Sequence, residues 1–147
     1  MNEHEKFMHY AYLEALKAYK ENEIPVGAII LDKDNKVIAK AHNKKNKCND
    51  VTAHAEILAI KKASKKLKSW HLDECKIYIT VEPCLMCSSA ILQSRIKSIY
   101  YGVESTFNEL SLKYLSDYLF DNNIEVKGNI LSDEISILLS NFFNKIR

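Results

Sequence analysis

Apolar side chains recur along this chain with two different periods. Met8, Ala11, Tyr12, Ala15 and Tyr19 follow the spacing of a helix, which predicts an amphipathic helix near the start of the chain. The runs at 26–31 and 36–41 are instead β-rich and flank a polar turn at 32–35. They predict a β-hairpin.

After the hairpin, the pattern alternates helices with strands. A helix is predicted over 53–67, a strand over 76–81, a second helix from residue 83 and a strand over 98–101. This order implies a right-handed parallel crossover within a mixed sheet that has helices on both faces. Helices are also predicted over 110–120 and 132–145, separated by a short strand at 124–126. The last helix is expected to place five apolar residues on one side: Ile135, Leu138, Leu139, Phe142 and Ile146.

Length and composition set the scale of the molecule. With 147 residues and 47% hydrophobic composition, residues 1–147 are expected to form one domain that has a full core and a buried pocket. No apolar run approaches the length of a membrane span, and the first residues lack the apolar core of a signal peptide. We therefore expect a cytoplasmic protein without membrane contact, whose reduced cysteines are available to bind metal.

Two short strings carry the candidate chemistry: HAE at 54–56 and PCLMC at 83–87. Thr52 is predicted to cap the helix over 53–67, which places the HAE string in the first turn. Pro83 suits the first position of the next helix, so Cys84 and Cys87 share one face of its first turn. The positive end of the helix dipole favours their thiolate forms.

His54, Cys84 and Cys87 together offer one nitrogen and two sulfur ligands, which suit tetrahedral zinc. Three protein ligands leave the fourth position open for water, as in catalytic zinc sites. Glu56 is then the general base, which moves protons from the water to the ring nitrogen and leaving amine of a substrate. The pairing of H-x-E with P-C-x-x-C is the signature of the zinc deaminases. It predicts one Zn²⁺ per subunit and hydrolytic deamination.

Two other interpretations of the cysteines compete with a catalytic zinc site. A C-x-x-C pair by itself is equally typical of a thioredoxin-like redox site, but the HAE string upstream favours metal. A structural zinc closed by Cys48 as fourth ligand would leave Glu56 without a task. Cys48 and Cys75 are better explained as ordinary reduced thiols.

Lysines gather between residues 40 and 68, although the formal net charge of the chain is only +2. Asp50 and Glu56 are the acidic residues of this segment. Such a band could attract a phosphate backbone, or it could simply be a solvated lysine-rich surface. The lysines are Lys40, Lys44, Lys45, Lys47, Lys61, Lys62, Lys65, Lys66 and Lys68.

Several strings together resemble the bacterial tRNA adenosine deaminases, and the similarity runs nearly from end to end. They are EIPVGA at 23–28, TAHAE at 52–56, TVEPCLMC at 80–87, SRI at 94–96, GNIL at 128–131 and LLSNFF at 138–143. The resemblance implies an α/β fold, a three-layer α/β/α cytidine deaminase-like arrangement with a mixed five-stranded sheet and helices on both faces. It also implies a homodimer that converts the wobble adenosine of a tRNA anticodon stem-loop to inosine.

The resemblance also implies roles for individual residues. His54, Cys84 and Cys87 match the zinc ligands, and Glu56 matches the proton shuttle. The remaining matched positions are expected to contact substrate. Asn43 would hydrogen-bond the flipped base, the Ala55 backbone would contact it, Pro25 and Val26 would line the pocket, and Phe143 and Arg147 would approach neighbouring nucleotides.

One segment departs from the pattern of the family. Where the family usually has a D-x-K-x-G-A segment that contacts RNA, this chain has Ser105, Thr106 and Phe107 and is about two residues shorter. Two alternatives therefore stay open beside the tRNA enzyme. One is a deaminase of free guanine or cytosine, and the other is a noncatalytic RNA-binding subunit stabilised by zinc.

Overall fold

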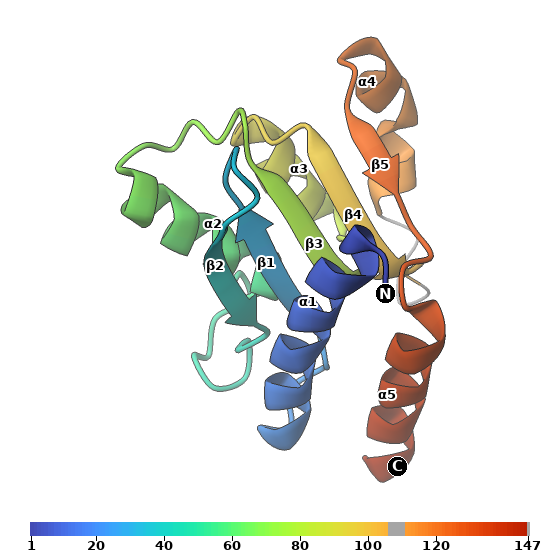
Figure 1. Cartoon of the computed structure of the whole chain (residues 1–147). Helices are drawn as coiled ribbons and strands as arrows, with labels where there is room; N and C mark the ends of the chain where they lie inside the picture. Colours follow the sequence, from blue (N-terminus) through green and yellow to red (C-terminus); the bar gives the residue numbers. More distant parts are fainter. Residues whose placement is uncertain (106–110, 147) are drawn as a thin grey trace.

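The computed structural model of the chain describes residues 1–105 and 111–146 (Figure 1). Its elements agree with the predicted order. They are α1 (Glu3–Lys20), β1 (Gly27–Leu31), β2 (Val37–His42), α2 (Ala55–Leu67), β3 (Lys76–Val81), α3 (Leu85–Gln93), β4 (Ser98–Val103), a 3-10 helix (Leu112–Leu115), α4 (Ser116–Asp121), β5 (Glu125–Lys127) and α5 (Ser132–Lys145).

The five strands form one mixed sheet in the order β2-β1-β3-β4-β5. β1 is antiparallel to both of its neighbours, whereas β3, β4 and β5 are parallel to one another. The predicted hairpin and parallel crossover are therefore confirmed. Because β2 and β3 are both antiparallel to β1, they point in the same direction, and their carboxyl ends lie at the same edge of the sheet.

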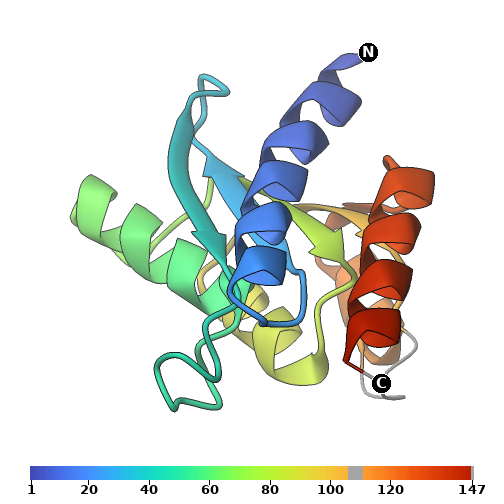
Figure 2. The same cartoon turned by 90° about the horizontal axis from the view of Figure 1, so that it is seen from below.

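Helices cover both faces of the sheet, as predicted (Figures 1 and 2). On one face, Ile29 and Leu31 of β1 pack in a cluster with Met8 of α1 and Ile135 of α5. On the other face, the alternate residues of β1 pack with the alanines of α2 and with Ile91 of α3. This alternation along one strand produces the three-layer α/β/α arrangement.

The first helix is fixed at its start and along its length. Asn2 caps it, and the side chain of Glu5 completes a capping box with the backbone of Asn2. At β1, a Cβ on Gly27 would overlap the backbone carbonyl oxygen of Ala11. Glycine is therefore required for the close approach of α1 to the sheet.

The C-terminal part differs from the prediction in two details. The expected helix over 110–120 is a 3-10 turn followed by the short α4, and Leu110 lies outside the described residues. On α5, Ile135, Leu138 and Phe142 are buried as predicted, but Ile146 follows the helix and is 58% exposed. Within the described part of the chain, no helix has the length and apolarity needed to span a membrane.

Candidate active site

The ends of β2 and β3 lead to the starts of the two helices that carry the candidate ligands. α2 begins after His54 and α3 begins after Cys84, and both residues have the extended backbone of an N-cap. The predicted caps were therefore wrong. Thr52 lies two residues before the cap, and its hydroxyl donates to Asp50 at 2.8 Å. Pro83 precedes α3 instead of occupying its first position.

This correction places the ligands closer to the helix ends than predicted. An N-cap side chain lies beside the first turn, so Cys84 at the cap and Cys87 three residues later face the same site. His54 at the cap of α2 likewise faces away from the helix axis and toward α3. Its cap position explains how His54 and Glu56, which would point to nearly opposite sides in the middle of a helix, serve one centre.

The three predicted ligands lie together in the structure. The Nδ1 atom of His54 is 3.8 Å from the Sγ of Cys84 and 3.5 Å from the Sγ of Cys87. Ligand atoms of a tetrahedral zinc, at about 2.3 Å for sulfur and about 2.0 Å for nitrogen, lie roughly 3.6 Å from one another. The donor set and its spacing therefore fit zinc. Cys48 is exposed and does not belong to this ligand group, which excludes it as a fourth ligand in the described structure.

Electrostatics at the ligands favour a thiolate on Cys84. A hydrogen bond from the Cys87 thiol and another from His54 lower the pKa of Cys84 to about 4, although burial opposes this shift. The same bond to Cys84, together with burial, raises the pKa of Cys87. The pKa of His54 is raised, chiefly by its hydrogen bond with Cys84, and the positive charge of Lys45 works against that rise.

Glu56 is a buried carboxyl group beside these ligands. Its exposed fraction is 4%, and burial raises its pKa to about 7. A carboxyl group whose pKa lies near neutrality can both accept and donate a proton, which is what a general acid and base requires. The burial and raised pKa of Glu56 are properties that a proton-transfer group needs, and its catalytic role stays a prediction.

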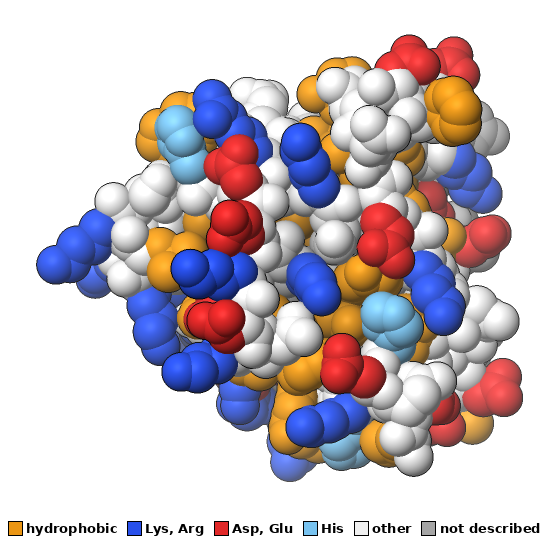
Figure 3. Space-filling model, turned by 45° about the horizontal axis from the view of Figure 1, so that its top comes forward, with side chains coloured by type: hydrophobic (Ala, Val, Ile, Leu, Met, Phe, Trp, Pro, Cys, Tyr) orange, Lys and Arg blue, Asp and Glu red, His pale blue; other side chains and the backbone are white. Residues whose placement is uncertain are grey.

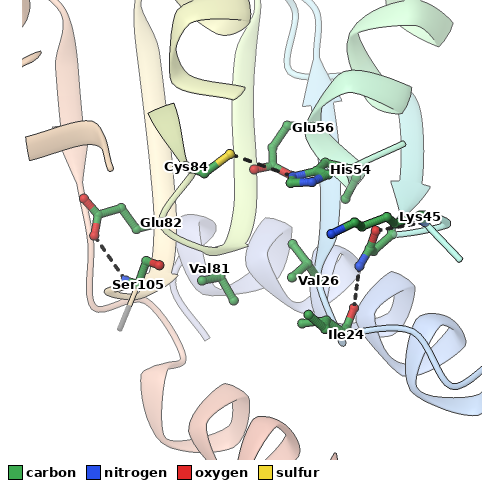
Figure 4. A pocket seen from close by; sticks show the side chains of 11 residues that line it. Ile24, Val26, Lys45, His54, Glu56, Val81, Glu82, Cys84 and Ser105 are labelled. Atoms are coloured by element: carbon green, nitrogen blue, oxygen red, sulfur yellow. Dashed lines mark hydrogen bonds between the residues drawn. The ribbon is translucent and has the colours of Figure 1, made fainter. Parts of the chain in front are cut away.

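A cavity of about 270 Å³ opens directly onto this centre (Figure 4). Val26, which was predicted to line the pocket, does so, and Asn43 and Ala55 are also in the lining, whereas Pro25 is buried and is not part of it. The full lining is Ile24, Val26, Asn43, Lys45, His54, Ala55, Glu56, Val81, Glu82, Cys84 and Ser105. The volume suits a small ring bound next to Glu56, with the rest of any larger substrate outside the cavity.

Comparison with known proteins places this site in a family. The model of the cytidine and deoxycytidylate deaminase zinc-binding region matches residues 1–103. A tRNA-specific adenosine deaminase of Aquifex aeolicus is 42% identical over 97% of this chain and 95% of its own length. The chain belongs to the tRNA adenosine deaminases of this zinc-binding family.

Solved structures agree with the assignment to this family. One, from studies of A-to-I editing by tRNA:A34 deaminases at the wobble position, has a TM-score of 0.83 and 34% identity and covers 91% of this chain and 99% of its own. A guanine deaminase of Bacillus subtilis has a TM-score of 0.66 and 32% identity and covers 84% of this chain and 95% of its own. The fold is thus shared by deaminases of RNA and of free bases.

Sequence reasoning missed the buried carboxylate that holds one wall of the cavity. Glu23 is 1% exposed, and its two oxygens accept backbone N–H bonds from Asn46 at 3.0 Å and Lys47 at 2.8 Å. Beside it, the Asn43 side chain donates to the Ile24 carbonyl at 3.4 Å. The only signal in the sequence was that Glu23 begins the EIPVGA string, one of the strings that resemble the family. That resemblance implied no role for Glu23.

The opposite wall carries a second buried carboxylate. Glu82 is 5% exposed, and its Oε1 accepts the backbone N–H of Ser105 at 3.1 Å. The backbone of Cys84 forms an isolated antiparallel bridge with Ser111. The segment at 105–107 is the one that differs from the family pattern. Its first residue, Ser105, lines the cavity, while Thr106 and Phe107 lie outside the described residues.

Two further residues, Phe143 and Arg147, were predicted to contact substrate, and Phe143 is not among the described residues that line the cavity. Phe143 is half-buried on α5 and packs edge-on against Phe142 at a ring separation of 5.4 Å. Arg147 lies outside the described residues. Their expected roles stay predictions.

The lysine band divides into three parts in the structure: Lys40 lies on β2, three lysines lie in the loop after β2, and five lie on α2 or just past its end. Basic side chains gather on the side of the molecule that carries α2 (Figure 3). Those at 61–68 lie on the later turns of α2 or just past its end, roughly 10–20 Å along the helix axis from the His54 cap. Only the part in the loop after β2 lies beside the site, and there Lys45 lines the cavity.

Proposed function

We propose that this protein deaminates the wobble adenosine of a tRNA anticodon to inosine, as a zinc-dependent hydrolase. The observation that carries the proposal is the placement of Glu56 beside the His54, Cys84 and Cys87 ligand group at the floor of a cavity. The relatives named tRNA-specific adenosine deaminase supply the identity of the substrate.

The residues of the chain divide the work of hydrolysis between them. His54, Cys84 and Cys87 would hold the zinc ion, which when bound lowers the pKa of a water molecule to about 7. Glu56 takes the proton from the attacking water and delivers protons to the ring nitrogen and the departing amine. The C6–O bond forms, the C6–N bond to the amino group breaks, and ammonia and inosine are the products.

The cavity walls are suited to hold a flipped base. Asn43 uses one amide N–H toward Ile24 and one lone pair toward the Lys45 backbone, so its amide keeps a second donor and a second acceptor position for a base. Ala55 is the first residue of α2, and its backbone N–H lacks an acceptor within the helix. Val26 supplies an apolar surface on which a ring can pack.

The remaining expectations concern the surroundings of the enzyme. We propose that residues 1–147 act as one domain, because β5 and α5 complete the same sheet and layers as the family region at 1–103.

A homodimer is supported by apolar side chains exposed around α4, including Phe120 at 85% and Tyr118 at 50%. Four free cysteines are consistent with a reducing, cytoplasmic compartment. The anticodon stem-loop of tRNA is the proposed nucleic-acid partner.

Inosine formation by the zinc-loaded protein tests the proposal. The substrates are an anticodon stem-loop with adenosine at the wobble position and, in parallel, free adenosine, guanine and cytosine. We expect turnover of the stem-loop only. Turnover of a free base alone would assign the site to the base deaminases, and no turnover of any substrate by protein with one bound zinc would favour the noncatalytic RNA-binding alternative.

A further inference from the structure

Lys45 occupies an unusual position among the lysines of the loop after β2. It is exposed and lines the cavity, and its side chain points toward the middle of the lining, across from Glu82 and Ser105 (Figure 4). Among the described lining residues, it is the one Lys or Arg side chain. The proposed mechanism does not use a positive charge at this point, because Glu56 accepts and donates the protons of the hydrolysis.

The charge of Lys45 is not neutralised within the described structure. Lys47, two residues later, has its Nζ 3.9 Å from a carboxylate oxygen of Glu21. No such ion pair involves Lys45 in the described part of the chain. An unpaired ammonium at the mouth of a substrate cavity is suited to receive an anionic group of the ligand.

The backbone that carries Lys45 is held on both sides. The N–H of Lys45 donates to the Asn43 side chain at 3.2 Å, and its carbonyl accepts from Asp50 at 3.0 Å. The two residues that follow Lys45 are bound by the buried Glu23. The ammonium therefore projects from a preorganised loop, which lowers the entropic cost of using it in binding.

The size of the cavity limits which part of an RNA it can enclose. At about 270 Å³, the cavity lies below the range of about 300–1,000 Å³ that encloses a drug-sized ligand. A base fits next to Glu56, but the sugar-phosphate backbone of an RNA must stay at the mouth, where Lys45 lies. We propose that the ammonium of Lys45 binds a phosphate flanking the target nucleotide and so selects a nucleotide within RNA over a free base or nucleoside. This inference rests on the proposed function.

A double-mutant cycle between protein and RNA tests the contact. Wild type, Lys45→Ala and Lys45→Arg are assayed on an anticodon stem-loop and on two analogues, each with a neutral methylphosphonate at one phosphate of the target adenosine. Lys33→Ala is the matched control, because Lys33 is an exposed lysine in the β1–β2 turn, at the opposite end of β1 from the cavity.

We expect Lys45→Ala to lower kcat/KM about tenfold on the natural RNA, mainly through KM, as the loss of one charge-assisted hydrogen bond predicts. One of the two analogues should abolish that tenfold difference, and Lys45→Arg should retain most of the activity. Lys33→Ala should match wild type on every RNA.

The outcomes separate the two proposals. Active wild type with the same tenfold loss for Lys45→Ala on all three RNAs would overturn the phosphate contact and leave the deaminase assignment intact. Equal activity of Lys45→Ala and wild type would do the same. Wild type that makes no inosine from any stem-loop would overturn both.

Discussion

The buried carboxylate of Glu23 offers a direct measure of how firmly the loop after β2 is held. Glu23→Ala removes the acceptor of two backbone N–H bonds, from Asn46 at 3.0 Å and Lys47 at 2.8 Å. Bonds to a charged acceptor contribute about 1.5–3 kcal/mol each. Both donor residues are exposed, so water replaces part of the loss, and we expect about 3 kcal/mol in total. For a domain of this size, that corresponds to a fall of about 6–12 °C in Tm.

Thermal and urea unfolding of the metal-loaded protein measure this loss. Glu74→Ala is the control, because Glu74 is exposed and its removal should change stability by less than about 0.5 kcal/mol. Glu23→Gln keeps one acceptor oxygen and should fall between the two. A Glu23→Ala protein as stable as the Glu74→Ala control would refute the assignment of Glu23 as the anchor of the loop.

Further predictions concern the catalytic group, the metal, the packing of α1 and the response to acid. Glu56→Gln should keep its zinc, measured by metal content, but lose about 10²–10⁴-fold in kcat, and full activity would contradict its role. Cys87→Ser should lose zinc and the stability that the metal supplies, seen as a Tm that no longer responds to added Zn²⁺. Gly27→Ala should cost roughly 3 kcal/mol in urea unfolding, because the added Cβ overlaps the backbone of α1. Burial raises the pKa of Glu14, but hydrogen bonds from Lys17 and His42 outweigh it and lower the pKa. Its ionisation therefore stabilises the fold above about pH 4.5, and this stabilisation is lost as pH falls through the lowered pKa, whereas Glu14→Gln should lack that acid-dependent loss.

The order of elements could be predicted because each has a strong local signal. The hairpin has two β-rich runs around a polar turn, and the predicted ranges 26–31 and 36–41 differ from β1 and β2 by one residue at most. The C-terminal helix has a regular apolar stripe. Such signals come from burial on one face, which a single sequence records directly.

The caps of the two site helices could not be predicted from the same signals. Thr52 is a better capping residue than His54 by general preference, and Pro83 is favoured at a first helical position. In the structure, Thr52 instead pairs with Asp50, and two poor capping residues, His54 and Cys84, occupy the caps. The general preference for capping residues is overridden here, because only the cap positions bring the His54 and Cys84 side chains together between the two helices.

The buried carboxylates of the cavity walls could not be predicted, for a different reason. Glutamates are usually exposed at the surface. Glu23 and Glu82 are instead buried, and their partners are backbone N–H groups of loops distant in sequence. Only the tertiary structure brings these donors to the buried carboxylates. The resemblance to the family located the neighbouring strings but carried no information about these contacts.

The topology separates the chemistry of the site from its selectivity. Because β2 and β3 point in the same direction, the helices that follow them begin at one edge of the sheet. The starts of these helices carry the candidate metal ligands and Glu56. Lys45 of the loop at 44–50 and Ser105 after β4 line the cavity from outside these helices. Their segments are held by backbone bonds to the buried carboxylates Glu23 and Glu82. Lys45 is exposed and is not one of the candidate metal ligands, so a substitution there changes the cavity lining without removing a ligand. Members of one fold can differ in substrate through positions of this kind.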